Sequence, residues 1–167
     1  MEFKKATKED LPKIMEIIGQ AKEFFKTKGI NQWQDNYPNE EVITDDINKG
    51  ESYILVKDDK IIGTVAVSFE KEIAYEKIYE GKWLSNNDYC VIHRIAVHND
   101  YKGLGISHNM IKCIERLCIE NGINSIKIDT DENNNIMKGM LKKNSFEYCG
   151  LIYYENNNKK IAFEKLF

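Results

Sequence analysis

A glycine-containing turn between a predicted strand and a predicted helix is the stretch of this chain best suited to binding chemistry. Gly103 and Gly105 follow polar residues that begin at position 99, and the apolar side chains after them recur at helical spacing. A helix that begins where a strand ends presents unpaired backbone N–H groups and the positive end of its dipole. The turn therefore indicates an anion site, and the alternative is a tight connection that holds no ligand.

The strand before this turn carries a histidine that could act as a base. Residues 90–97 are apolar and rich in β-branched side chains, interrupted by His93 and Arg94. Alternation along the strand places His93 on the same side as Ile95 and Val97. Imidazole exchanges a proton near neutral pH, so His93 is a candidate general base. The alternative is a partly buried structural ring that hydrogen-bonds to a neighbour.

The composition limits the classes of partner that this chain could serve. It has 167 residues, of which 42% are hydrophobic and 31% charged, with 24 Lys and Arg against 27 Asp and Glu. A chain without a basic excess does not favour nucleic acid or an anionic membrane, so a small-molecule partner is expected. No apolar run approaches the roughly 20 residues of a membrane span. We therefore expect a cytoplasmic protein with one domain over residues 1–167.

The cysteines are predicted to be small core residues. They form no C-x-x-C pair and lie inside predicted strands or a helix, at Cys90, Cys113, Cys118 and Cys149. We therefore expect no metal site.

Strand and helix signals follow one another without a repeat or a linker. Thr7 and Asp10 resemble a capping box that opens a first helix, Gly29 ends this helix, and Asn39 could cap a second. Residues 70–88 form an excursion that is too long for a plain hairpin turn. The strand, helix, strand order around the glycine turn implies parallel pairing. The expected strands cover residues 3–6, 53–57, 61–69, 90–97, 123–130, 146–154 and 160–167.

This order of elements, together with the segment RIAVHNDYKGLGIS, resembles the GNAT superfamily of acetyl-CoA-dependent N-acetyltransferases. The resemblance covers nearly the whole chain. It implies an α/β (α+β) fold with a mixed, mostly antiparallel sheet of about seven strands and about four flanking helices. It also implies that the sheet is splayed between its fourth and fifth strands.

The resemblance implies an acetyl-CoA site on the strand and the turn. The family pattern Q/R-x-x-G-x-G/A aligns with a run that keeps the central glycine and departs from the pattern at its first and last positions. These aligned residues are Lys102, Gly103, Leu104, Gly105, Ile106 and Ser107. In the family, the end of the fourth strand pairs with the pantetheine arm of coenzyme A, and here that end is Ile95, Ala96 and Val97. Asn134 takes the position of the Asn in the family's later motif and is added to the cofactor-binding residues.

The resemblance also assigns catalytic residues, with one gap. The sequence HRIAVH resembles a motif of arylalkylamine N-acetyltransferases in which a histidine at the place of His93 serves the base pathway. The helix tyrosine that protonates the leaving thiolate in many members is replaced here by Leu141. Tyr153 is a weak candidate for this acid, and a tyrosine on a half-buried strand is more often a packing residue. A backbone N–H near Val97 could hold the oxyanion.

The acceptor is expected to be a primary amine of a small molecule or a peptide, acetylated by direct attack in a ternary complex. Trp33, Tyr37 and Tyr79 are the candidates for its pocket, and the acidic residues Glu76 and Glu80 suggest a cationic amine. Trp33 and Tyr37 could instead anchor a loop to the core. The protein could be a monomer or a homodimer. The rival function is a non-catalytic CoA-binding or protein-interaction module with the same fold.

Overall fold

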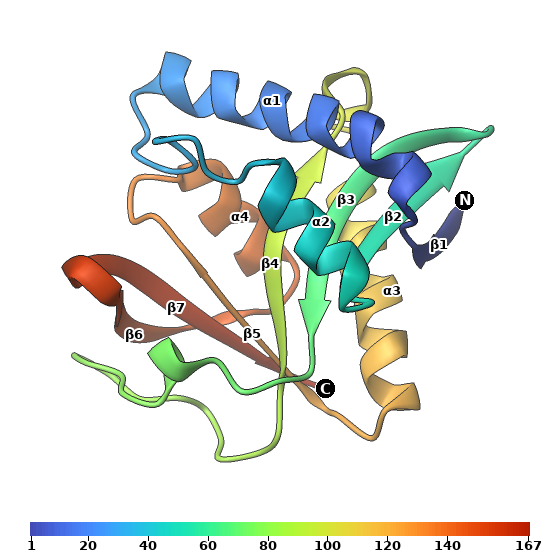
Figure 1. Ribbon diagram of the computed structural model, residues 1–167. Helices are drawn as coiled ribbons and strands as arrows, with labels where there is room; N and C mark the ends of the chain where they lie inside the picture. The colour runs from blue at the N-terminus through green and yellow to red at the C-terminus, as the bar shows by residue number, and fades with distance from the viewer. The chain divides into compact units, whose positions relative to one another are not determined.

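The computed structural model describes residues 1–167 and contains one seven-stranded sheet with four α-helices (Figure 1). The sheet order is β1-β2-β3-β4-β5-β7-β6. The strands are β1 (Glu2–Lys5), β2 (Ser52–Lys57), β3 (Lys60–Ser68), β4 (Cys90–Val97), β5 (Ser125–Thr130), β6 (Glu147–Tyr154) and β7 (Asn158–Leu166). The helices are α1 (Leu11–Lys28), α2 (Glu40–Asn48), α3 (Ile106–Glu120) and α4 (Asn135–Lys143).

The strand pairing confirms the predicted fold. Adjacent pairs such as β1 with β2, β2 with β3, β5 with β7 and β6 with β7 are antiparallel. β4 and β5 are parallel, and their ladder is short, with Cys90 opposite Ile126 and Val91 opposite Lys127. The mixed sheet with a splay between its fourth and fifth strands is therefore present. Predicted element boundaries differ from the observed ones by only a few residues.

The chain divides into two compact units, of which the first comprises residues 1–67 and 93–113. Its local signals are those expected from the sequence. The Thr7 N–H donates to the Asp10 carboxylate at 2.8 Å, and Asn39 caps α2 by accepting from the Val42 N–H at 3.0 Å. Gly29 ends α1 in the left-handed conformation, with φ of +67°. The apolar faces of both helices pack with β2 around Ala6, Ile14, Ile18, Ile43 and Ile54.

Within this unit, β3 has a bulge beside the point where α3 contacts the sheet. Val56 is opposite Ile61 and Leu55 is opposite Gly63, so Ile62 is an extra residue on β3. A Cβ atom on Gly63 would lie 2.7 Å from the sulfur of Met110 on α3. A larger residue at position 63 would therefore displace the end of the Met110 side chain, so glycine allows the close approach of α3.

The second unit comprises residues 68–92 and 114–167 and has its own core. The buried residues of this core come from the excursion, from β4 and from the last hairpin: Tyr75, Val91, Ile152 and Ala162. Glu164 on β7 is fully buried and accepts hydrogen bonds from the Leu84 N–H at 2.8 Å and the Ser85 hydroxyl at 2.7 Å. These bonds fix the end of the excursion, which carries a single 3-10 turn at Ile73–Tyr75.

The excursion also pairs with the edge of the sheet. Tyr79 and Leu151 of β6 exchange two backbone hydrogen bonds of 2.8 Å. The backbones approach so closely that a Cβ atom on Gly81 would lie 1.9 Å from the Cys149 carbonyl oxygen. The expected loop thus adds a short strand-like segment to β6.

The four cysteines are free thiols, and Cys113 is the only one that is partly exposed. No group of His, Cys, Asp or Glu side chains is arranged to hold a metal ion. None of the helices is long and apolar enough to cross a membrane.

Candidate functional site

The turn after β4 has the backbone geometry of an anion site. Gly103 and Gly105 both have left-handed conformations, with φ of +77° and +76°. A Cβ atom at either position would meet nothing within 4 Å, so the backbone conformation and not space is what favours glycine. The Asn109 N–H makes an early helical bond to the Gly105 carbonyl at 3.1 Å. The N–H groups of Ile106 and Ser107 come before that bond, in the first turn of α3, where backbone N–H groups have no acceptor within the helix and the helix dipole is positive.

Helix α1 holds this turn in place. The side-chain oxygen of Gln20 accepts from the Asn99 N–H at 2.8 Å. The His98 ring accepts from the Asp100 N–H through Nδ1 at 3.1 Å and lies 3.2 Å from the Gln20 amide nitrogen. These contacts fix the chain just before the two glycines.

The Lys102 ammonium lies over the ring of Phe24 on α1, 4.5 Å from its centre. Partial burial lowers the pKa of Lys102. The cation that replaces the family's usual Gln or Arg is therefore held against an aromatic ring at the foot of the turn. Sequence reasoning missed Gln20 and Phe24 because nothing local marks them as neighbours of residues 78 positions away.

The end of β4 is ordered and largely buried. Ile95 is 8% exposed and Ala96 is 9% exposed, and the His98 N–H donates to the Ile62 carbonyl at 2.9 Å. His93 is partly buried one residue before Arg94. Arg94 has a left-handed conformation with φ of +53°, which interrupts the regular alternation of side chains along β4. Alternation therefore does not establish that His93 lies on the same side of the strand as Ile95 and Val97.

The Arg94 guanidinium of the first unit is held by three hydrogen bonds. Its Nε and Nη2 donate to the two oxygens of Asp46 at 2.8 Å and 2.7 Å, and its Nη1 donates to the Tyr37 hydroxyl at 2.8 Å. The side chains of Arg94 and Asp46 are only 14% and 7% exposed. Burial acts to lower the pKa of Arg94, but Tyr37 and the Asp46 carboxylate outweigh it and raise the pKa above its ordinary value. The guanidinium therefore stays charged.

The predicted acceptor residues of the first unit differ in their surroundings. The Trp33 ring packs edge-on against Phe25, with ring centres 5.5 Å apart, and joins the core around α1 and α2. Tyr37 is 42% exposed and is bonded to Arg94. Trp33 thus anchors the loop, and Tyr37 presents its ring to solvent.

In the second unit, Asn134 directly precedes α4 and Leu141 lies within it. Asn134 is 2% exposed and caps the helix by accepting from the Met137 N–H at 3.1 Å. This cap accounts for an Asn here, and the cofactor role of Asn134 stays a prediction. Leu141 is fully buried, so the position of the usual acid is a packing position in this chain.

The tyrosines of the last hairpin have two different environments. Tyr153 is 39% exposed and packs edge-on against Tyr79, with ring centres 5.3 Å apart. Tyr154 is partly buried and donates to Asp129 at 2.5 Å, and the buried Tyr75 donates to the same carboxylate at 2.7 Å. Burial first, and then Asp129, raises the pKa of both Tyr75 and Tyr154, so both phenols stay protonated. The structure thus brings together Tyr79 and Tyr153, both of which were candidates from the sequence.

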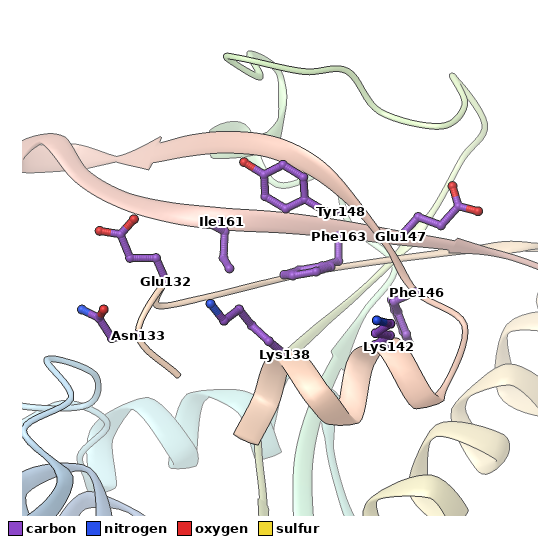
Figure 2. Close-up of a pocket in the computed structure, with 9 residues that line it drawn as sticks. All are labelled: Glu132, Asn133, Lys138, Lys142, Phe146, Glu147, Tyr148, Ile161 and Phe163. Carbon is purple, nitrogen blue, oxygen red and sulfur yellow. The ribbon is translucent and has the colours of Figure 1, made fainter. Parts of the chain in front are cut away.

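A groove of about 700 Å³ opens between α4 and the β6–β7 hairpin (Figure 2). Lys138 and Lys142 line it from the helix, and Tyr148 and Phe163 line it from the hairpin with their rings packed edge-on at 5.8 Å. None of the residues predicted for catalysis or cofactor binding lines this groove.

Comparison with known proteins decides the family. The sequence profile of the acetyltransferase (GNAT) family matches residues 13–146. This chain belongs to the GNAT acetyltransferase family. No curated protein sequence matches it closely enough to add a more specific relative.

Solved structures agree with this membership. A GNAT-family acetyltransferase from Streptococcus agalactiae is 30% identical, with a TM-score of 0.90 over 99% of this chain and 95% of that one. Two more distant structures share the fold. The PaiA N-acetyltransferase from Thermoplasma acidophilum, solved in complex with coenzyme A, is 16% identical, with a TM-score of 0.71 over 99% of this chain and 98% of that one. Naa50 from Arabidopsis thaliana, solved with the bisubstrate analogue CoA-Ac-MVNAL, is 18% identical, with a TM-score of 0.67 over the same shares.

Proposed function

We propose that this GNAT-family protein transfers the acetyl group of acetyl-CoA to a primary amine of a small molecule or a peptide. The observation that carries the proposal is the turn with two left-handed glycines, Gly103 and Gly105, at the start of α3. Backbone N–H groups at a helix start suit a pyrophosphate whatever side chains flank them, so the changes at Lys102 and Ser107 leave the site usable. Ile95, Ala96 and Val97 would pair with the pantetheine arm. One acetyltransferase domain over residues 1–167, acting in the cytoplasm as a monomer or homodimer, is part of this proposal.

The proposed chemistry is direct attack in a ternary complex. The amine nitrogen bonds to the acetyl carbonyl carbon, the carbon–sulfur bond breaks, and the products are an acetamide and the thiol of coenzyme A. His93 would take the proton that the amine loses, directly or through water. Tyr153 is the candidate to protonate the thiolate, and its half-exposed phenol is compatible with that role. A backbone N–H near Val97 would stabilise the oxyanion.

Two measurements test the proposal. Isothermal titration should detect binding of acetyl-CoA, and no binding at millimolar ligand would refute it. Thiol release with a panel of primary amines should then identify acceptors. His93→Ala should lower turnover with little change in acetyl-CoA affinity, and an unchanged pH–rate profile would remove His93 from the mechanism.

The rival function is a non-catalytic CoA-binding or protein-interaction module. It is favoured by Leu141, which is fully buried where many family members have their catalytic acid. Binding of acetyl-CoA without acceptor-dependent thiol release would support this rival over the enzyme.

A further inference from the structure

The three bonds of the Arg94 guanidinium determine how Tyr37 can bind a ligand. A guanidinium can only donate hydrogen bonds. In the 2.8 Å contact between Arg94 and Tyr37, the phenolic oxygen must therefore be the acceptor. The hydrogen of the same hydroxyl then points away from the guanidinium and remains for another partner. Accepting a bond from a cation also polarises the hydroxyl and strengthens its donation.

Arg94 itself has little freedom to move. Two short bonds tie it to Asp46, which is 5% exposed on α2. Its left-handed backbone is costly for a residue with a long side chain, and it persists because the surrounding contacts hold it. Arg94 on β4 and Asp46 on α2 together thus fix the direction of the hydrogen bond that the Tyr37 hydroxyl accepts.

The loop that carries Tyr37 is fixed as well. Trp33 packs on Phe25, and the Gln34 side chain donates to the Gln32 carbonyl at 3.0 Å. The Tyr37 N–H donates to the Gln34 carbonyl at 3.3 Å. The phenol is therefore a pre-positioned donor on a ring that is 42% exposed.

We propose that Tyr37 is a specificity-determining residue that selects acceptor amines carrying a carboxylate or carbonyl oxygen near the amino group. This inference rests on the proposed acetyltransferase function. Arg94 and Asp46 are positioning residues that act through Tyr37. An oriented donor gains a hydrogen bond from such an oxygen, whereas the hydrocarbon chain of a simple alkylamine and a second ammonium group offer no acceptor. Amino acids and their amides thus fit Tyr37 better than simple alkylamines or polyamines.

The size of the preference follows from the cost of one hydrogen bond. A site that donates a hydrogen bond to a substrate oxygen favours that substrate over the matched amine that lacks the oxygen. The expected ratio of kcat/KM values is about 10-fold for a carbonyl oxygen and about 100-fold for a carboxylate. Tyr37→Phe removes the donor and keeps the ring, so it should reduce the preference to about 2-fold or less. Arg94→Lys keeps the charge but loses the two-pronged contact with Asp46, so it should lower the preference in part.

The test uses three matched amines: phenethylamine, phenylalaninamide and phenylalanine. Thiol release gives kcat/KM, and ligand-observed NMR with the CoA-loaded protein gives binding without turnover. Tyr148→Phe is the control, since Tyr148 is an exposed tyrosine of β6 in the second unit. Equal values for the three amines, a preference of the same size in wild type and Tyr37→Phe, or no binding of any amine would each overturn the inference. If no amine supports thiol release but NMR still shows a binding preference that depends on Tyr37, the acetyltransferase function is refuted and the role of Tyr37 in binding stands.

Discussion

The buried ion pair between Arg94 and Asp46 allows a quantitative prediction for stability. Asp46→Asn keeps the shape of the side chain but removes its charge from beside a guanidinium that is 14% exposed. Breaking a buried pair by changing one partner costs about 3–5 kcal/mol, and Asn can retain one of the two bonds, so we expect about 3 kcal/mol. For a chain of this size, that loss corresponds to a fall in Tm of about 6–12 °C.

The neighbouring residue on the same helix supplies the control. Asp45 pairs with Lys49 at 3.1 Å, but these side chains are 60% and 55% exposed. Asp45→Asn should therefore cost less than about 1 kcal/mol. Urea denaturation followed by circular dichroism measures both variants, provided that their m-values agree. If Asp46→Asn and Asp45→Asn unfold at the same urea concentration, the argument from burial is wrong.

A double-mutant cycle separates the pair from its surroundings. Arg94→Met alone leaves the Asp46 carboxylate buried without its cation, whereas Arg94→Met with Asp46→Asn removes both charges. We expect the double variant to be more stable than the sum of the single losses predicts, by about 2 kcal/mol. An additive result would mean that the two side chains act independently.

Two further substitutions and the ionisation of one thiol test other parts of the structure. Gly105→Ala must adopt a left-handed conformation, so titration should show acetyl-CoA binding weakened about 10-fold, and unchanged affinity would argue against the turn as its site. Gly81→Ala places a methyl group 1.9 Å from a backbone oxygen and should cost at least about 2 kcal/mol in urea, whereas Gly139→Ala in α4 meets nothing within 4 Å and should be neutral or stabilising. Burial, and then Glu164, raises the pKa of Cys149 to about 11, so iodoacetamide should alkylate it about 100-fold more slowly at pH 8 in the native protein than in urea. Because this thiol ionises more easily when unfolded, native stability should fall as the pH rises from about 9 towards 11.

Features that depend on residues close in sequence were predictable. Thr7 with Asp10, Gly29 and Asn39 mark helix ends because each makes its bonds within a few positions. The turn at Gly105 was predictable for the same reason, since glycine meets the demand for a left-handed backbone. These local signals predicted the order of elements along the chain, and the family resemblance implied the mixed sheet with its splay, which the structure confirms.

The contacts that position charged groups were not predictable, because their partners are far apart in the chain. In the sequence, Asp46 resembles the other acidic residues of α2, yet it is buried against Arg94, which lies 48 residues further along the chain. Asp129 similarly lies near the end of a predicted strand with nothing local to mark its partners, yet it accepts hydrogen bonds from the hydroxyls of Tyr75 and Tyr154. The left-handed backbone of Arg94 has no sequence signature, because a long cationic side chain is not typical of that conformation.

The two hydrogen bonds between Tyr79 and Leu151 have a consequence for the protein in crowded solution. β6 is the last strand of the sheet, and an open strand edge offers N–H and C=O groups on which another chain can build a strand. The segment around Tyr79 already occupies this template at Leu151, and Gly81 allows it to lie flat against the strand. The segment around Tyr79 therefore covers the β6 edge at Leu151, and we expect variants that detach it to form aggregates at concentrations that the native protein tolerates.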